Sequence, residues 1–230
     1  KNKKICFITG SRAEYGLLQL LIKKVNSDKD LKLQIIATGM HLSERFGYTF
    51  KEIEEDGFFI DSKVEMLQSS DSELDLVKAI SVGMEGFSKV IAKLKPDLII
   101  VLGDRFEIFA AVISATILRI PIAHIHGGET TEGSFDESFR HSITKMSHLH
   151  FTSTEDSYKR VLQLGEDPDR VFNVGAIGVE KIKLTALLSK NVFEKSIKFS
   201  LGKKNLLITF HPVTLEKSAP ELQFQELLNS

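Results

Sequence analysis

The chain lacks the features that stabilise extracellular or membrane-spanning proteins. Its one cysteine, Cys6, excludes an internal disulfide framework and is typical of a reducing cytosol. We interpret it as a small buried side chain of a strand. The most apolar long stretch, residues 108–118, is too short to cross a bilayer and includes Ser114 and Thr116. The apolar run at the basic amino end is shorter than the roughly 7–15 residues of a signal peptide. We therefore expect a soluble cytoplasmic protein with no membrane partner.

An excess of charge of either sign is also lacking. The net charge is −1, from 30 Lys and Arg against 31 Asp and Glu, and there is no long run of like charge. Basic patches that would indicate a nucleic-acid-binding protein are therefore absent from the sequence, and so are charged tails. What the 230 residues do have is a hydrophobic content of 42%, enough for a sizeable core. The composition favours a globular protein that binds no nucleic acid.

Residues 97–141 are the stretch on which our functional interpretation depends. Two apolar runs rich in Ile and Val, residues 98–102 and 120–125, each end in a cluster of glycine and charged residues. Between them, residues 106–118 have helical length and composition. This order predicts two parallel strands, buried on both faces and joined by a helix. In open α/β sheets, ligands bind at the carboxyl ends of such strands, where the two polar clusters would lie.

The rest of the chain alternates in the same way. Asp71 is a candidate cap for a long helix, and Gly57 a candidate end for the helix before it. The six or seven strands expected over residues 1–175 predict an α/β fold with a doubly wound parallel, Rossmann-like sheet. Besides the central stretch, we predict strands at residues 4–9, 31–37, 58–66, 148–152 and 171–174, and helices at residues 14–25, 46–56, 71–94, 135–146 and 154–164.

The carboxyl-terminal part is predicted to begin a second unit of the same kind. Residues 181–200 should be mostly helical with a break near residues 189–191, and a strand at 205–210 and a helix at 221–228 should follow. We therefore expect a Rossmann-like domain over residues 1–180, a helical connection over 181–203, and the start of a second domain over 204–230. One strand and one helix cannot bury a core, so we expect a chain that continues or a segment that packs on the first domain.

The first turn, Gly10-Ser11-Arg12, follows a predicted strand and precedes a helix. Free backbone N–H groups, the positive end of the helix dipole and the Arg12 guanidinium would suit a phosphate. The sequence is not GxGxxG, so an ordinary turn with a surface arginine is the alternative. The turn after residues 98–102 contains Asp104 and Arg105. Asp104 either caps the next helix or is an acid or base in the crevice, with Arg105 on a phosphate.

Two histidines, His124 and His126, alternate along the next predicted strand, so both should point to one face. Such a pair can ligate a metal, but no further His or Asp has clear ligand spacing, and an imidazole beside carboxylates suits proton transfer equally well. We expect no metal. We interpret His141, His148 and His150 as structural or surface histidines.

More acids follow these histidines. Glu129 lies in a glycine-rich loop, and Asp136 and Glu137 lie near a helix start, where either one could simply suit the helix dipole. Several acids crowded at one sheet edge would raise at least one pKa, and a paired acid and base need such separated pKa values. The acids expected to converge are Asp104, Glu129 and one of Asp136 and Glu137; Arg12, Arg105 and His211 would supply positive charge for a leaving diphosphate.

Together these turns resemble the hydrolysing branch of the UDP-N-acetylglucosamine 2-epimerase family, and the likeness runs in order over essentially the whole chain. The motifs that carry it are GSRAEYGLL (residues 10–18), GDRFE (103–107), HIHGGETTEG (124–133), DESFRHSITKMSHLHF (136–151), NVGAIGVE (173–180) and TFHPVT (209–214). The resemblance implies two Rossmann-like domains with a cleft between them, as in GT-B glycosyltransferases, in a protein longer than 230 residues. It also implies a homodimer and no redox cofactor.

The resemblance implies a reaction as well. UDP-GlcNAc loses its C2 proton and UDP, and water then adds to the resulting glycal, giving N-acetylmannosamine for sialic-acid-type sugars. This chemistry needs a base, an acid and stabilisation of the leaving group. Carried over by motif, Asp104 and one of the pair Asp136 and Glu137 are catalytic carboxylates. Arg12, with Ser11 beside it, Arg105 and His211 are contacts of the UDP-sugar substrate.

One departure from the family pattern leaves a role open. Many relatives have a glutamate in the HxE-type turn, where this chain has His126, with Glu129 three residues on, and either could fill the role. The sugar is open too, because a close variant acts on UDP-2,4-diacetamido-2,4,6-trideoxyglucose on the way to legionaminic acid. A GT-B glycosyltransferase would also fit the sequence, and so would a nucleotide-sugar binder without catalytic activity. We expect residues 1–230 alone to give little turnover.

Overall fold

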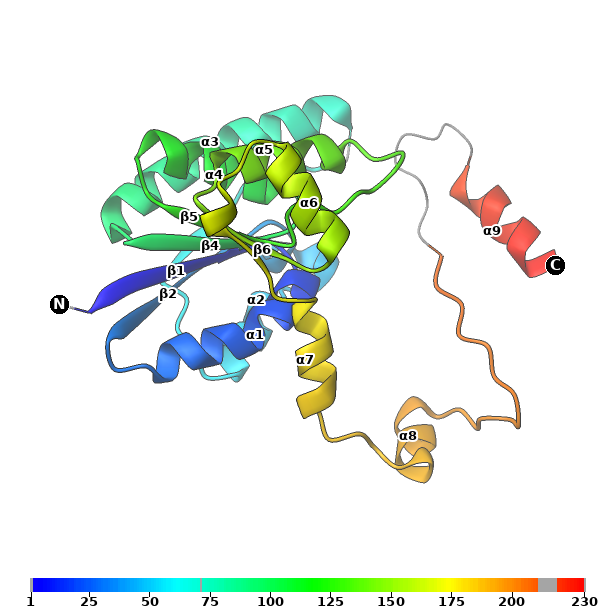
Figure 1. The fold of residues 1–230 in the computed structure, drawn as a ribbon. Coiled ribbons are helices and arrows are strands. Elements are labelled where there is room, and N and C mark those ends of the chain that lie inside the picture. Colours follow the sequence, from blue (N-terminus) through cyan, green and yellow to red (C-terminus); the bar gives the residue numbers. More distant parts are fainter. Residues whose placement is uncertain (1, 71, 211–218, 230) are drawn as a thin grey trace.

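The structure is a computed structural model that describes residues 2–70, 72–210 and 219–229 (Figure 1). Within these residues the strands are β1 (Lys3–Thr9), β2 (Leu31–Thr38), β3 (Ser62–Val64), β4 (Leu98–Leu102), β5 (Ile122–Ile125), β6 (Leu149–Thr152) and β7 (Val171–Asn173). The α-helices are α1 (Arg12–Ser27), α2 (Phe50–Glu55), α3 (Glu73–Leu94), α4 (Phe106–Ile117), α5 (Asp136–Met146), α6 (Glu155–Gln163), α7 (Ile177–Leu184), α8 (Lys190–Ile197) and α9 (Pro220–Asn229), with 3₁₀ turns η1 (Gly39–Leu42), η2 (Glu44–Phe46) and η3 (Pro168–Arg170).

The described strands form one parallel sheet in the order β3-β2-β1-β4-β5-β6-β7. This confirms the predicted doubly wound α/β fold. The chain starts in the middle of the sheet, moves out to β3, and returns to place β4 beside β1. The loops after β1 and β4 therefore diverge to opposite faces, and this switch in direction creates the crevice in which α/β proteins bind ligands.

Helices cover both faces of the sheet, so its central strands are apolar on both sides (Figure 1). In β1, Phe7 packs with α1 and α2, whereas Ile8 packs on the opposite face with α3 and α4. Cys6 is fully buried on that second face, as expected, and burial raises the pKa of its thiol. The core thus forms two layers, one on each side of a sheet whose carboxyl edge stays open to polar loops.

Two local predictions were wrong for identifiable reasons. The helix predicted at residues 46–56 begins only at Phe50, because Gly47 and Tyr48 both have positive φ, 80° and 50°, and interrupt it. It ends before Gly57, as predicted. The cap of α3 is Ser72, whose side chain accepts a hydrogen bond from the Asp75 N–H. Asp71, the predicted cap, lies outside the described residues.

The segment after β7 differs more from the prediction. Residues 185–189 separate α7 from α8, so the break comes earlier than expected. Residues 205–210 form no strand: among the described residues they have no pairing partner, and Leu206 and Leu207 are almost fully exposed.

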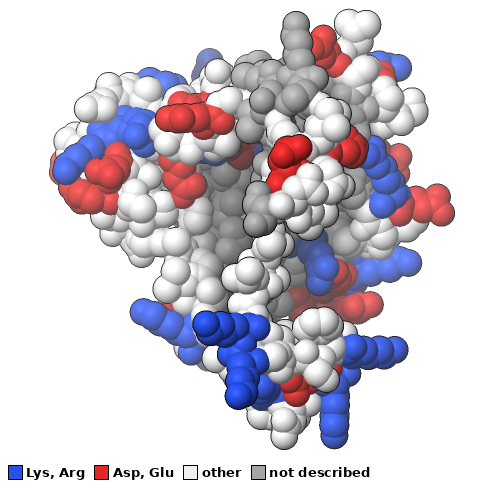
Figure 2. Space-filling view, turned by 90° about the vertical axis from the view of Figure 1, so that its right-hand side faces the viewer, with Lys and Arg blue, Asp and Glu red and all other residues white. Residues whose placement is uncertain are grey.

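Figure 2 shows basic side chains gathered at the lower end of the face it presents, at the height of α8, which includes Lys190 and Lys195. In the described part of the chain, no helix has the length and apolarity needed to cross a membrane.

Candidate active site

The predicted functional turns lie where the switch in strand order places them. Gly10 and Ser11 follow β1, Asp104 and Arg105 follow β4, and His126 follows β5. The loop from β5 to α5 carries Glu129 and leads to Asp136, the first residue of α5. All these residues come from the carboxyl edge of one parallel sheet, because each loop leaves the end of a strand that runs in the same direction.

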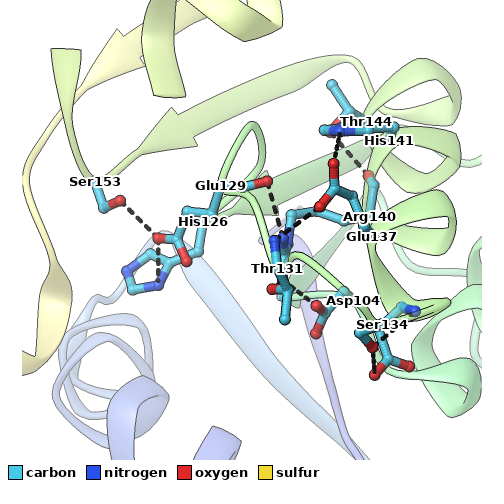
Figure 3. Close-up of polar contacts among 12 residues, drawn as sticks. Asp104, His126, Glu129, Thr131, Ser134, Glu137, Arg140, His141, Thr144 and Ser153 are labelled. Carbon is cyan, nitrogen blue, oxygen red and sulfur yellow. Dashed lines mark hydrogen bonds and ion pairs between the residues drawn. The ribbon is translucent and has the colours of Figure 1, made fainter. Parts of the chain in front are cut away.

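Arg140 joins two of these loops, the one after β4 and the one after β5 (Figure 3). It lies on α5 with only 5% of its surface exposed, and one guanidinium nitrogen makes an ion pair with the Asp104 carboxylate. The other donates to the Glu129 carbonyl oxygen at 2.8 Å, and the first also reaches the Thr131 hydroxyl at 2.9 Å. Asp104 therefore does not cap the next helix: Arg105 occupies the cap position of α4, and the Asp104 carboxylate turns to Arg140 instead.

Asp136 lies close enough to Asp104 for its negative charge to affect the pKa of the Asp104 carboxyl. Burial raises the pKa of the Asp104 carboxyl above its ordinary value; the Arg140 guanidinium opposes this, and the negative charge of Asp136 adds to it. The Asp136 carboxylate accepts a hydrogen bond from the Ser134 hydroxyl at 2.7 Å. We call Asp104, Asp136 and Arg140 the Arg140 cluster. It brings together two of the three acids that were expected to converge.

Glu137, the neighbour of Asp136, has a different environment. Its carboxylate accepts the Thr131 N–H at 2.8 Å and lies 3.6 Å from Nε2 of His141 (Figure 3). The Thr131 N–H lowers the pKa of Glu137, with a further contribution from His141. These contacts fold the loop back onto the start of α5, so of the acidic pair Asp136 is the member that acts on Asp104.

The Glu129 carboxylate belongs to a second group with His126 and Ser153. It accepts a 2.6 Å hydrogen bond from the Ser153 hydroxyl, and one oxygen is 3.3 Å from Nδ1 of His126 (Figure 3). Burial lowers the pKa of His126, and the negative charge of Glu129 partly offsets this. Nε2 of His126 is buried with no partner among the described residues. Glu129 thus meets the Arg140 cluster through its backbone carbonyl rather than its carboxylate.

His124 and His126 do not act as the pair that their alternation predicted. β5 ends at Ile125, and His126 has a φ of 63°, so the regular alternation of side chains stops there. His124 is fully buried, with Nε2 donating to the Gly103 carbonyl at 2.8 Å and Nδ1 3.2 Å from the Thr144 hydroxyl. Burial lowers the pKa of His124 to about 3, so it is a neutral structural residue. The described residues contain no group of three or more His, Cys, Asp or Glu placed to hold a metal ion.

The turn after β1 is not the open phosphate site that its position suggested. The backbone N–H groups of Gly10 and Ser11 both donate to one oxygen of Glu14, at 2.6 and 3.0 Å. Ser11 caps α1 by accepting the Glu14 N–H, so the two residues cap the helix reciprocally. The amides expected to be free for a ligand are therefore satisfied within the protein.

Arg105 lies next to this turn and is held by Glu107. Its guanidinium makes two hydrogen bonds to the fully buried Glu107 carboxylate, at 3.1 and 2.7 Å. Glu14 is buried beside this pair, and burial together with the charge of Glu107 raises the pKa of Glu14 to about 8. We call Glu14, Arg105 and Glu107 the Arg105 cluster. The sequence pattern pointed to Arg105 but gave no role to Glu14 or Glu107, although both lie within the family motifs.

Arg12, a further predicted substrate contact, is not joined to these clusters. Arg12 is 74% exposed at its side chain and pairs with Glu52 of α2 at 3.0 Å, in a hollow that also includes Tyr15 and Lys181. His211 lies outside the described residues. The larger cavity, of about 620 Å³, is lined by Arg105 and Asp136 from the two clusters, and by residues of the loops after β2 and β3 such as Phe46 and Gln68.

This arrangement offers the elements of acid–base chemistry beside a cavity. Burial raises the pKa of Asp104 above its ordinary value, and a second acid lies next to it, which is the arrangement that an acid–base pair needs. Arg105 and Arg140 supply positive charge at the same edge. The sequence pattern gave Arg140 no role. Its position one turn after Asp136 on α5 was the only feature of the sequence that could have indicated one.

The fold and this edge define a Rossmann-like α/β protein with a polar crevice at its strand ends. UDP-GlcNAc 2-epimerase from Neisseria meningitidis, solved with UDP-GlcNAc bound, has the same fold: its TM-score is 0.70 at 22% identity, over 85% of this chain and 54% of that one. The family model described as UDP-N-acetylglucosamine 2-epimerase matches residues 23–230. The chain belongs to that family, which confirms the resemblance found in the sequence.

Three curated relatives are similar over 99% of the chain. The GDP/UDP-N,N'-diacetylbacillosamine 2-epimerase (hydrolyzing) of Campylobacter jejuni is 45% identical over 227 residues. Polysialic acid biosynthesis protein P7 of Escherichia coli is 42% identical, and the UDP-N,N'-diacetylbacillosamine 2-epimerase (hydrolyzing) of Legionella pneumophila is 38% identical. The matches cover 59%, 58% and 60% of these proteins, so the chain spans about three fifths of their length.

Proposed function

We propose that the protein carrying this chain is a hydrolysing UDP-sugar 2-epimerase. A base removes the C2 proton of the sugar while the bond from C1 to UDP breaks, and the C–H electron pair forms a C1=C2 double bond. Water then adds its oxygen to C1 and gives up one proton to a base, while an acid delivers a proton to C2 on the opposite face. The observation that supports this best is the Arg140 cluster, in which a carboxyl with a raised pKa lies beside a second acid at the cavity.

The proposed roles follow from the environments of the residues. Asp104 and Asp136 exchange protons with C2, and Arg140 holds Asp104 in place. The pair His126 and Glu129 is the second candidate for an acid or base. The 3.3 Å distance between Nδ1 of His126 and the Glu129 carboxylate, which Ser153 holds by a hydrogen bond, supports a joint role in which Glu129 orients the imidazole ring.

The UDP leaving group requires positive charge. We propose that Arg105 meets the diphosphate, because it lines the cavity together with Asp136. Arg12, whose side chain is exposed at the same edge, is a further proposed contact, and Ser11 and His211 remain proposed contacts from the motif alone. A second Rossmann-like domain, beginning near residue 204, would close the cleft.

The sugar is the finer part of the proposal. Two of the three relatives described above are named for diacetylbacillosamine sugars, at 45% and 38% identity, and one for polysialic acid biosynthesis, at 42%. We therefore propose UDP-2,4-diacetamido-2,4,6-trideoxyglucose as the first substrate to test and UDP-GlcNAc as the second. The cavity of about 620 Å³ has room for a sugar with acylamino groups. Either product would supply the synthesis of nonulosonic acids.

The test is an assay of the full-length protein with each UDP-sugar in D₂O. We expect release of UDP together with one deuterium at C2 of the free 2-epimeric sugar, faster with the diacetamido sugar. UDP release without deuterium at C2 would indicate simple hydrolysis or glycosyl transfer and contradict the proposal. Deuterated N-acetylmannosamine from UDP-GlcNAc alone would keep the reaction and reverse the choice of sugar.

A further inference from the structure

The Arg105 cluster contains more acid than its single cation can balance. Both oxygens of Glu107 take hydrogen bonds from Arg105, at 3.1 and 2.7 Å, so the guanidinium is paired with Glu107. Glu14 receives no side-chain donor: one of its oxygens accepts the N–H groups of Gly10 and Ser11, and the other is buried with no partner among the described residues. An ionised carboxylate with one oxygen left in this state would be costly to bury, which favours its neutral form.

The packing leaves little freedom to relieve this crowding. A Cβ built on Gly10 would stand 3.4 Å from the near oxygen of Glu14 and 3.5 Å from the carboxyl carbon of Glu107, so the two carboxyls flank this glycine. A Cβ on Gly39, which has a φ of 56°, would stand 2.6 Å from Oε1 of Glu107. Glycine at both positions therefore lets the two acids approach the strand ends closely.

No other described charge has the contacts needed to compensate Glu14. The neighbouring Arg12 is turned outward to Glu52 on α2. His41 of η1 is fully buried between the hydroxyls of Thr9 and Thr49, and its pKa is lowered to about 4 by burial, so it stays neutral. From α4 and its preceding turn, Glu14 faces Glu107 and Arg105, which are already paired with each other.

We propose that Glu14 is a positioning residue that stays protonated beside the Arg105–Glu107 ion pair and so preserves the attraction of Arg105 for a substrate diphosphate. The proposal rests on the proposed function for its ligand. With Glu14 neutral, the cluster has no net charge. Loss of the Glu14 proton adds a negative charge beside Arg105, and this charge repels an anionic diphosphate at the same place. The raised pKa of Glu14, about 8, sets the pH range in which this change falls.

The same proton links Glu14 to the stability of the fold. In the unfolded chain a glutamate ionises near its ordinary value of 4.5, whereas folding raises the pKa of Glu14 to about 8. Between these two values the folded protein holds a proton that the unfolded chain has lost, so stability falls as pH rises through this window. Above pH 8 the Glu14 contribution becomes constant. Glu14→Gln keeps an oxygen to accept the Gly10 and Ser11 N–H groups but cannot ionise, and it should therefore remove this contribution.

The experiment measures UDP affinity and thermal unfolding of the full-length protein between pH 5 and pH 9. For the wild type we expect the dissociation constant of UDP to rise about tenfold between pH 7 and pH 9. For Glu14→Gln we expect little change over that range. The melting temperature of Glu14→Gln relative to wild type should increase from pH 5 to pH 8 and then level off. Glu85→Gln, an exposed position paired with Lys89, is the matched control and should follow the wild type.

If the melting temperatures of wild type and Glu14→Gln changed with pH in the same way, the proposed protonation of Glu14 in the folded protein would be overturned. UDP affinity with the same pH dependence in both proteins would overturn the positioning role. If UDP did not bind at any pH in this range, the proposed function would fail. The comparison of melting temperatures would still decide whether Glu14 is protonated. If Glu14→Gln did not fold, ¹³C NMR titration of the wild-type glutamates would replace it, and a Glu14 carboxyl that ionised at its ordinary pKa would contradict the inference.

Discussion

The Arg140 cluster and the Arg105 cluster are built from the same groups, two acids and one arginine, at the same edge of the sheet. They differ in burial and in what lies next to them. In the Arg105 cluster, Glu107 is fully buried and Glu14 is only 5% exposed, and neither lines the cavity. In the Arg140 cluster, the Asp104 side chain is 22% exposed and Asp136 lines the cavity. An acid therefore lines the cavity at the Arg140 cluster, whereas at the Arg105 cluster both acids are sealed from it and only Arg105 lines it.

This difference separates two uses of a raised carboxyl pKa. A buried acid whose partners are all in the protein can set the charge of its surroundings but cannot reach a substrate. An acid beside a cavity can exchange a proton with one. We therefore assign proton transfer to the Arg140 cluster and electrostatic support to the Arg105 cluster, and variants of each should fail in different ways.

The largest expected effect is on Asp104. Asp104→Asn removes the proposed proton-exchanging group while keeping its shape, and we expect kcat/KM to fall by about 10²–10⁴-fold. The melting temperature should fall as well, because the buried Arg140 loses its charged partner. Steady-state kinetics of the full-length protein measure the first, and thermal unfolding the second. Asp169→Asn, at an exposed position in η3, is the control and should keep full activity. A fully active Asp104→Asn enzyme would remove Asp104 from the reaction.

Arg140→Lys should have the next largest effect. Lysine keeps the positive charge but cannot reach the Asp104 carboxylate, the Glu129 carbonyl and the Thr131 hydroxyl together, as the guanidinium does. We expect kcat/KM to fall by about 10–100-fold because Asp104 is no longer held in place. The pH profile should also shift upward, since Arg140 opposes the rise in the pKa of Asp104. Unchanged kinetics would show that Arg140 has no positioning role.

Gly39→Ala tests the packing of the Arg105 cluster. The new Cβ would stand 2.6 Å from Oε1 of Glu107 and would be strained by the φ of 56°, so we expect a loss of about 2–4 kcal/mol in the free energy of unfolding. Gly47→Ala is a matched control, because Gly47 has a φ of 80° but no atom within 4 Å of the new Cβ. It should cost only about 1–2 kcal/mol. Equal losses in the two variants in denaturant titrations would contradict close packing around Glu107.

The smallest effect is expected at Glu137. Its carboxylate accepts the Thr131 N–H, and an amide oxygen can accept the same bond, so Glu137→Gln should change kcat/KM by less than about threefold. Its lowered pKa means that the wild-type residue is already ionised well below neutral pH, so the activity profile should keep its shape. The measurement is kcat/KM as a function of pH for Glu137→Gln and Asp136→Asn, assayed side by side. A larger loss for Glu137→Gln than for Asp136→Asn would exchange the two proposed roles.

Sequence periodicity predicted the sheet well, because strands buried on both faces are short apolar runs that end in glycine and charge, as at residues 98–102. It also placed Asp104 and Arg105 at the correct edge. It could not foresee that Glu14 would fold back onto the Gly10 and Ser11 amides, because that depends on side-chain direction within one helical turn. The strand predicted at residues 205–210 shows a second limit of sequence periodicity. An apolar run forms a strand only where a neighbouring strand can pair with it, and the run itself does not show whether one is present.

The most direct test of the account is the titration of the Asp104 carboxyl, followed by ¹³C NMR in wild type and Asp136→Asn. The proposed acid–base pair requires that the charge of Asp136 reach Asp104. We predict a pKa for Asp104 above its ordinary value in the wild type and a lower one in Asp136→Asn. A pKa of Asp104 that is ordinary in the wild type, or unchanged by the substitution, would contradict a shared site for the two acids.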